Sequence, residues 1–113
     1  MHELPITENI LEITLRYAKQ ANALQVKTIY LVIGQLASVV DESVQFYWDI
    51  IAKNTIAENA VLSFKRIPAT FQCRACSFCF SPGEENFYCP KCNSFDVKII
   101  SGNEFFLEAI DVE

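Results

Sequence analysis

The segment of residues 73–92, which reads CRACSFCFSPGEENFYCPKC, limits the possible folds of this chain more than any other feature. Its two C-x-x-C pairs are separated by twelve residues, a pattern typical of sites in which four thiolates bind zinc tetrahedrally. The surrounding residues 69–98 are too few to build an apolar core of their own. We therefore expect metal ligation to supply the folding free energy of this segment, on the order of 10 kcal/mol or more for structural zinc.

A fifth cysteine allows two choices of ligands, because Cys76 and Cys79 also form a C-x-x-C pair. Zinc-binding turns often need a left-handed backbone position directly after the second cysteine, and Gly and Asn adopt it most easily. Asn93 suits this position well, Ser77 acceptably and Phe80 poorly. The predicted zinc ligands are Cys73, Cys76, Cys89 and Cys92. Cys79 is then a spare thiol, although the alternative frame stays open.

Four thiolate ligands leave no coordination position for water, and the chain's single histidine is at position 2. We therefore expect a structural zinc and a protein that is not an enzyme. A thioredoxin-like redox pair is disfavoured, because that motif has one C-x-x-C at a strand-to-helix junction. Many zinc ribbons bind nucleic acid, but the charges of residues 69–98 balance and the chain carries a net charge of −5. Direct nucleic-acid binding is not predicted, and a zinc-ribbon adaptor in transcription or translation remains the alternative function class.

Length and composition indicate a small globular protein. The chain has 113 residues, 51% hydrophobic and 20% charged, which suits one domain or a small domain with an insert. No apolar run approaches the ~20 residues of a membrane span, and the first residues lack the features of a secretory signal. We expect a cytoplasmic location and no membrane association. Five cysteines, an odd number, in that reducing compartment favour metal binding over disulfides.

Outside the cysteine-rich segment, the hydrophobic pattern predicts two helices and three strands. Helices are expected at residues 4–22 and 44–53, and strands at residues 26–33, 60–67 and 104–112. The first helix carries an apolar stripe of Ile6, Ile10, Ile13, Tyr17 and Ala21, widened by Leu11, Leu15 and Ala18. Asp41 is the expected N-cap of the second helix, with Glu42 favourably placed against the helix dipole.

These elements predict an α+β fold, with a three-stranded sheet and two helices. The cysteine-rich segment interrupts this layer between its second and third strands as a zinc-ribbon-like four-cysteine insert. The predicted domains are residues 1–68 with 99–113, and the zinc-binding residues 69–98. The exposed edge of the sheet could pair with another chain to give a homodimer.

The first three residues, Met1, His2 and Glu3, carry nitrogen donors that suit a second metal. A bulky second residue generally prevents removal of the initiator methionine, so we expect a free amine at a fixed distance from the His2 imidazole. These groups and nearby amides are donors that Ni(II) or Cu(II) accepts in planar or tetragonal fields. Because the first proline is Pro5, the amides of His2 and Glu3 are both available.

Several motifs together resemble one family over essentially the whole chain. They are the opening MHE, the segment IGQLASVVDESVQFYWDIIAKNTIAENAVLSFKRIPATFQCRAC, the later CPKC and the closing SGNEFFLEAIDVE. The sequence is similar to the HypA/HybF family, nickel metallochaperones of nickel–iron hydrogenase maturation. It departs from the family pattern at Ala37-Ser38, where Ser-Gly is more common, and at Asn54 and Ser77, where Gly is common.

The resemblance implies a nickel-binding α+β domain and a separate zinc domain. Nickel would be held at His2 and the neighbouring main chain of Met1 and Glu3, with Ni2+ as cargo and Zn2+ as a structural ion. The resemblance also implies delivery in concert with a HypB-like GTPase, with the hydrogenase large subunit as the recipient.

Overall fold

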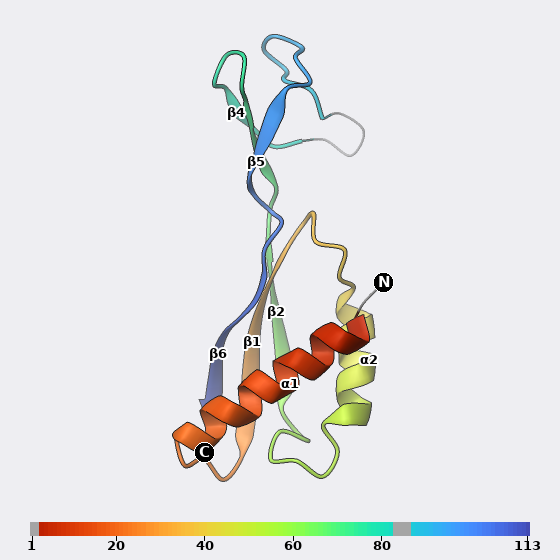
Figure 1. Cartoon of the computed structure of the whole chain (residues 1–113), viewed down its shortest axis with the longest axis vertical. Helices are drawn as coiled ribbons and strands as arrows, with labels where there is room; N and C mark the ends of the chain where they lie inside the picture. Colours follow the sequence, from red (N-terminus) through yellow and green to blue (C-terminus); the bar gives the residue numbers. More distant parts are fainter. Residues whose placement is uncertain (1–2, 83–86) are drawn as a thin grey trace. The chain divides into compact units, whose positions relative to one another are not determined.

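The computed structural model describes residues 3–82 and 87–113 (Figure 1). Its elements are α1 (Glu3–Gln20), β1 (Val26–Gly34), α2 (Asp41–Ile51), β2 (Val61–Ile67), β3 (Thr70–Cys73), β4 (Cys79–Phe80), β5 (Val97–Ser101) and β6 (Phe105–Val112). The predicted α+β fold is confirmed, and element boundaries differ from the expected ones by a few residues. Within the described ranges, no helix is long and apolar enough to span a membrane.

The chain folds as two compact units. The first consists of Met1–Val32, Ser38–Lys65 and Phe106–Glu113, and the second of Ile33–Ala37 and Arg66–Phe105. The first unit contains both helices, and the second contains the cysteine-rich segment. The boundaries predicted for the nickel-binding and zinc-binding domains remain a prediction.

β1 is the central strand of the first sheet, in which the strand order is β2-β1-β6. The consecutive residues Leu31, Val32 and Ile33 are all buried. Because successive side chains of a strand point to opposite faces, this run shows that both faces of β1 are covered. Helix α1 crosses one of these faces (Figure 1).

Hydrogen bonds at the strand ends fix the directions of the three strands. The Glu113 N–H donates to the Gln25 carbonyl at the start of β1, and the Gly34 N–H donates to the Glu104 carbonyl at its end. β1 and β6 are therefore antiparallel. The Gln35 N–H donates to the Ile67 carbonyl, where β1 and β2 both finish. These two strands run parallel, with α2 in the connection between them.

The buried line of α1 differs from the predicted apolar stripe. It consists of Glu3, Thr7, Ile10, Thr14 and Ala18. Of the five main residues of the predicted stripe, only Ile10 is buried, and Tyr17 is 47% exposed. The line runs between two apolar flanks, one carrying Ile13 and Tyr17 and the other Leu11 and Leu15. The hydropathy pattern identifies the apolar residues on either side of the buried line but not Thr7 and Thr14 within it. Threonine is classed as polar, although its side chain can pack in a protein core.

The prediction that Asp41 is the N-cap of α2 is wrong. Val40 holds this position in an extended conformation (φ −103°, ψ 122°), and no side chain caps the helix there. The Val40 carbonyl accepts the Val44 N–H at 3.1 Å, and the Val40 N–H donates to Oε2 of Glu3 at 3.4 Å. This contact from α1 could not be read from the local sequence. Asp41 and Glu42 lie in the first turn, where the helix dipole favours negative charge.

The second unit is built on a sheet with the strand order β4-β3-β5, in which β3 is antiparallel to both neighbours. Phe71 in β3 lies opposite Phe80 in β4 and Ile99 in β5. It is 5% exposed, and its ring centroid is 5.8 Å from that of Phe80 and 5.9 Å from that of Phe87. This aromatic cluster is a small core beside the cysteine-rich turns.

Two glycines allow backbone segments of the second unit to approach closely. A Cβ atom on Gly34 would lie 2.1 Å from the Gly102 carbonyl oxygen. Gly102 has a φ of 107°, and a Cβ atom there would lie 2.6 Å from the Cα atom of Ala69. A side chain at either position would force the backbone segments apart.

Thr7 and Thr14 provide a matched test of the α1 packing, because both are 0% exposed. The Thr7 hydroxyl donates to the Glu3 carbonyl, whereas Thr14 Oγ1 has no hydrogen-bond partner in the described part of the chain. An unsatisfied buried polar group costs about 1–3 kcal/mol, and Val and Thr have similar helix propensities. Thr14→Val should raise the free energy of unfolding by about 1 kcal/mol, and Thr7→Val should not. Urea unfolding followed by Trp48 fluorescence measures both; equal stabilisation by the two changes would contradict this account.

Candidate metal centre

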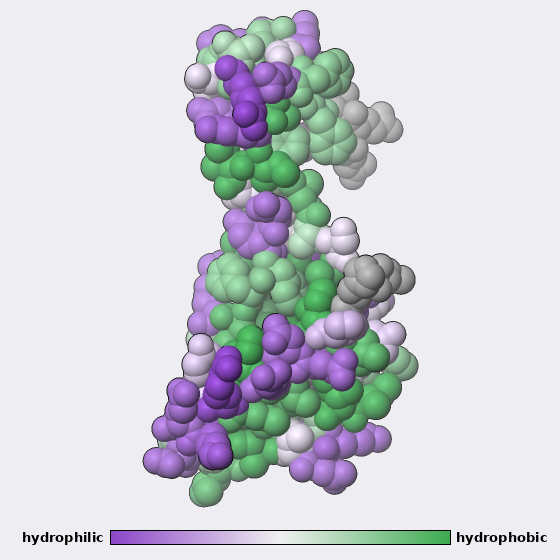
Figure 2. Space-filling view, in the orientation of Figure 1, coloured by the Kyte–Doolittle hydropathy of each residue, from purple (hydrophilic) through white to green (hydrophobic). Residues whose placement is uncertain are grey.

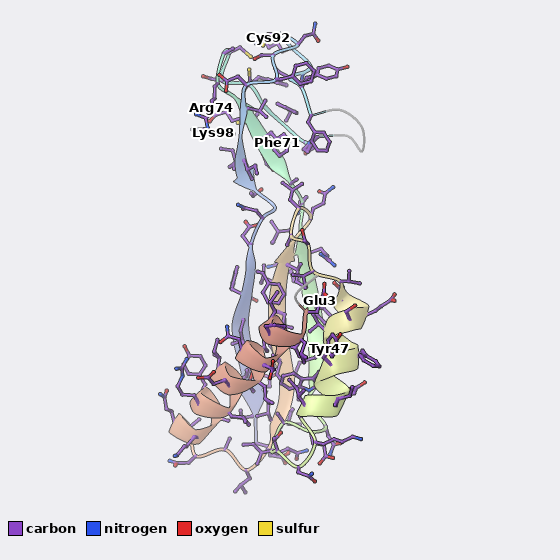
Figure 3. All side chains as sticks on the ribbon, turned by 45° about the vertical axis from the view of Figure 1, so that its right-hand side comes forward. Glu3, Tyr47, Phe71, Arg74, Cys92 and Lys98 are labelled. Atoms are coloured by element: carbon purple, nitrogen blue, oxygen red, sulfur yellow. The ribbon has the colours of Figure 1, made fainter. Side chains whose placement is uncertain are left out.

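Four cysteine sulfurs converge in the second unit (Figure 3). The Sγ atoms of Cys73, Cys76, Cys89 and Cys92 all lie within 4.8 Å of one another. Cys73 and Cys92 are 3.5 Å apart, and Cys76 and Cys89 are 3.6 Å apart, measured between sulfurs. A tetrahedral ion with Zn–S distances of about 2.3 Å requires sulfurs about 3.8 Å apart. The cluster therefore fits one tetrahedral ion.

Two turns with the same hydrogen bonds present these sulfurs. In the first turn, the Ser77 N–H donates to the Cys73 carbonyl at 2.9 Å, and the Cys73 N–H donates to the Phe78 carbonyl at 2.9 Å. In the second, the corresponding bonds run from Asn93 to Cys89 at 2.8 Å and from Cys89 to Ser94 at 2.9 Å. The two C-x-x-C pairs thus fold as copies of one local structure, and each contributes two sulfurs to the cluster.

The residue after the second cysteine of each pair is left-handed, as predicted. Ser77 has a φ of 65° and Asn93 a φ of 61°. Asn54 is also left-handed, with a φ of 66°. Asn54 and Ser77 are two of the positions where the similar family commonly has glycine, which adopts this conformation without steric cost. These departures therefore preserve the backbone conformation.

Backbone N–H groups favour the thiolates of the first cysteine in each pair. Burial raises the pKa of Cys73, but the N–H groups of Cys76 and Ala75 outweigh this effect and lower the pKa to about 7. Burial also raises the pKa of Cys89, but the N–H groups of Lys91 and Cys92 outweigh this effect, and the pKa of Cys89 is lowered. The turns therefore supply negative charge where a cation would bind.

Cys92 shows the opposite behaviour. The Ser94 N–H favours its thiolate, but the neighbouring Cys73 sulfur and burial raise the pKa of Cys92 to about 12. One thiolate therefore discourages ionisation of the next when no cation lies between them. A divalent cation would reverse this effect and favour all four thiolates.

Cys79 and an ion pair complete the surroundings of the cluster. Cys79 lies in β4 opposite Gln72, is exposed, and is not one of the four clustered sulfurs. The Arg74 N–H donates to the Asp96 carbonyl at 2.8 Å, and Arg74 Nε lies 3.6 Å from Asp96 Oδ1. This pairing joins the first turn to the residue just before β5, so it depends on the tertiary fold and could not be predicted from local sequence.

The second predicted metal site lies at the start of the chain. Met1 and His2 are outside the described residues. Glu3 is the first residue of α1, is 4% exposed, and lies beside the first turn of α2 (Figure 3). Its carboxylate accepts the Val40 N–H. The sequence did not indicate this burial, because a glutamate in the first turn of a helix is normally solvated.

Comparisons with known proteins agree over the full length. Residues 1–112 match the model of the family described as "Hydrogenase/urease nickel incorporation, metallochaperone, hypA". A hydrogenase maturation factor HypA of Dehalococcoides mccartyi is 46% identical over 113 residues, covering 100% of this chain and 95% of that protein. A protein of the same name from Caldanaerobacter subterraneus subsp. tengcongensis is 39% identical over 114 residues, covering 100% of both.

Two solved structures share the fold. The solution structure of the Ni metallochaperone HypA from Helicobacter pylori superposes with a TM-score of 0.67 at 23% identity, covering 99% of this chain and 97% of that one. A second solution structure of a HypA protein gives a TM-score of 0.75 at 22% identity, with 100% and 97% coverage. Fold, length and family model agree, and the chain belongs to the HypA family of nickel-incorporation metallochaperones.

Proposed function

We propose that this chain binds Ni(II) at Met1, His2 and Glu3 and hands it over for maturation of nickel–iron hydrogenase. The observation that carries the proposal is the family match over residues 1–112, which includes these three residues. The four-cysteine cluster supports it, because four sulfurs around one ion leave no open coordination position. A cargo ion then needs a different set of donors.

Structural Zn2+ is the ion that best suits the cluster. Zinc prefers four thiolates in a tetrahedron, and the sulfur spacing fits that geometry. Its binding would supply the folding free energy that the small aromatic core around Phe71 cannot provide alone. We assign Cys73, Cys76, Cys89 and Cys92 as its ligands and residues 69–98 as the zinc-binding domain.

The placement of Glu3 favours its backbone nitrogen as a nickel donor over its carboxylate. Glu3 begins α1, and the first N–H groups of a helix have no partner within the helix. Its carboxylate, in contrast, is buried and accepts the Val40 N–H. The Met1 amine, the His2 imidazole and the free amides then form a nitrogen-rich set suited to Ni(II). We assign residues 1–68 and 99–113 as the nickel-binding domain.

The partners follow from the proposed delivery. A HypB-like GTPase would act with this chain, and the hydrogenase large subunit would receive the ion in the cytoplasm. An exposed edge of the first sheet would support a homodimer, because β2 and β6 each have one neighbour in that sheet.

Nickel titration of two forms of the protein tests the N-terminal site. The form with its native terminus should bind one Ni(II), and a form with a few residues ahead of Met1 should bind at least tenfold more weakly, because the amine is displaced. His2→Ala should weaken binding similarly, and all three forms should retain equal zinc. Calorimetry gives the affinities; equal nickel affinity in the native and extended forms would contradict the proposal.

Two cysteine substitutions test the zinc assignment. Cys76→Ser should weaken zinc binding at least tenfold, since it removes a direct ligand and outer-shell changes alone cost about 10–100-fold. Cys79→Ser is the matched control and should keep one zinc per chain. Competition with a chromogenic chelator measures both affinities, and loss of zinc in Cys79→Ser would show that the ligand frame is wrong.

A further inference from the structure

A groove of about 540 Å³ lies on the first unit between α1 and α2. Glu8, Leu11, Glu12 and Leu15 of α1 line it, together with Ile51 of α2. The four α1 residues recur at spacings of three and four, so they form one continuous stripe on the helix. This stripe is separate from the proposed nickel donors and from the four cysteines.

Packing of α1 leaves the apolar residues of this groove only half-buried. The helix faces the core along the line of Thr7, Ile10, Thr14 and Ala18, so Leu11 and Leu15 lie on its flank. Ile51 is also half-buried. On the face that carries α1, hydrophobic side chains reach the surface among hydrophilic ones (Figure 2). Leu11, Leu15 and Ile51 therefore offer apolar side chains that a ligand could cover, next to the acidic residues of the same groove.

The rim of the groove is acidic. Glu8 and Glu12 are exposed and lie one helical turn apart, where like charges weaken a helix slightly. Among the residues that the structure describes, neither carboxylate forms an ion pair. A ligand that covers Leu11 and Leu15 would place the side chains at its own edge next to Glu8 and Glu12. Positively charged side chains there would complement the two carboxylates.

The length of the groove suggests the shape of its ligand. Glu8 to Leu15 spans two helical turns, about 10 Å. Two turns match the spacing of anchors at i, i+3 or i+4, and i+7 in an amphipathic helix that docks into a groove. A second copy of this chain fits less well, because it would bring the same acidic surface and a net charge of −5.

We propose that the groove between α1 and α2 binds a basic amphipathic helix of a partner protein. Apolar side chains of that helix fill the space between Leu11, Leu15 and Ile51. Lys or Arg side chains flanking them pair with Glu8 and Glu12.

The probe for this site is a labelled amphipathic peptide of Leu and Lys, about 14 residues long, which gives four helical turns. Its counterpart has Glu in place of every Lys. Fluorescence anisotropy on the zinc-loaded full chain should show binding of the Lys peptide, weakened by salt, and none of the Glu peptide. Equal binding of both peptides would overturn the charge argument.

Variants locate the binding surface. The double change Glu8→Lys with Glu12→Lys should weaken binding of the Lys peptide about tenfold. Glu108→Lys, an exposed carboxylate on β6, is the control and should have little effect. Leu15→Gln should also weaken binding, whereas Leu24→Gln, at a residue 84% exposed outside the groove, should not. An equal loss in groove and control variants would indicate general electrostatic attraction and overturn the proposal.

Two further readouts separate the possible outcomes. Nickel and zinc stoichiometry should be unchanged in the groove variants, so a failure here is distinct from a failure of the proposed nickel site. Sedimentation should show the same mass for the wild type and the double variant. If the wild type self-associates and the double variant does not, the groove holds a second copy of this chain and the proposal is wrong.

Discussion

Four sulfurs within 4.8 Å of one another cannot all carry negative charge unless a cation lies between them. The two C-x-x-C turns bring the sulfurs together and aim backbone N–H groups at them, which holds the pKa of Cys73 at about 7. The same proximity raises the pKa of Cys92 to about 12, above its ordinary value. The metal-free arrangement is therefore electrostatically frustrated, and a dication removes the frustration. We infer that the small sheet and aromatic cluster of the second unit depend on this ion.

The closed coordination of the four-cysteine site bears on what the protein can do. An ion surrounded by four thiolates has no vacant position for water or for a ligand from another protein. Membership of a metallochaperone family confirms the expectation that the chain is not an enzyme. A carrier has to release its cargo, so we infer that the cargo ion binds to donors other than the four cysteines. The buried carboxylate of Glu3 accepts the Val40 N–H, which ties the start of α1 to the N-terminus of α2.

The sequence predicted the features that depend on local pattern. Both helices, the strands of the first sheet and the left-handed positions at Ser77 and Asn93 follow from periodicity and turn chemistry. It failed where a tertiary contact decided the outcome. Val40 replaces Asp41 at the helix start, where Glu3 reaches across from α1, and threonines occupy the centre of the buried α1 line. The sequence also did not predict the groove lined by Leu11 and Leu15, because apolar residues on the side of a helix and on its buried face have the same sequence pattern.

X-ray absorption of the protein loaded with both metals can distinguish a closed zinc cluster from a separate nickel site, because the zinc and nickel edges report each ion's ligands separately. We expect four sulfur neighbours at about 2.3 Å around zinc. Around nickel we expect only nitrogen and oxygen neighbours, in a protein with no residues added ahead of Met1. Sulfur scattering at the nickel edge, or fewer than four sulfurs at the zinc edge, would contradict the separation of a structural cluster from a cargo site.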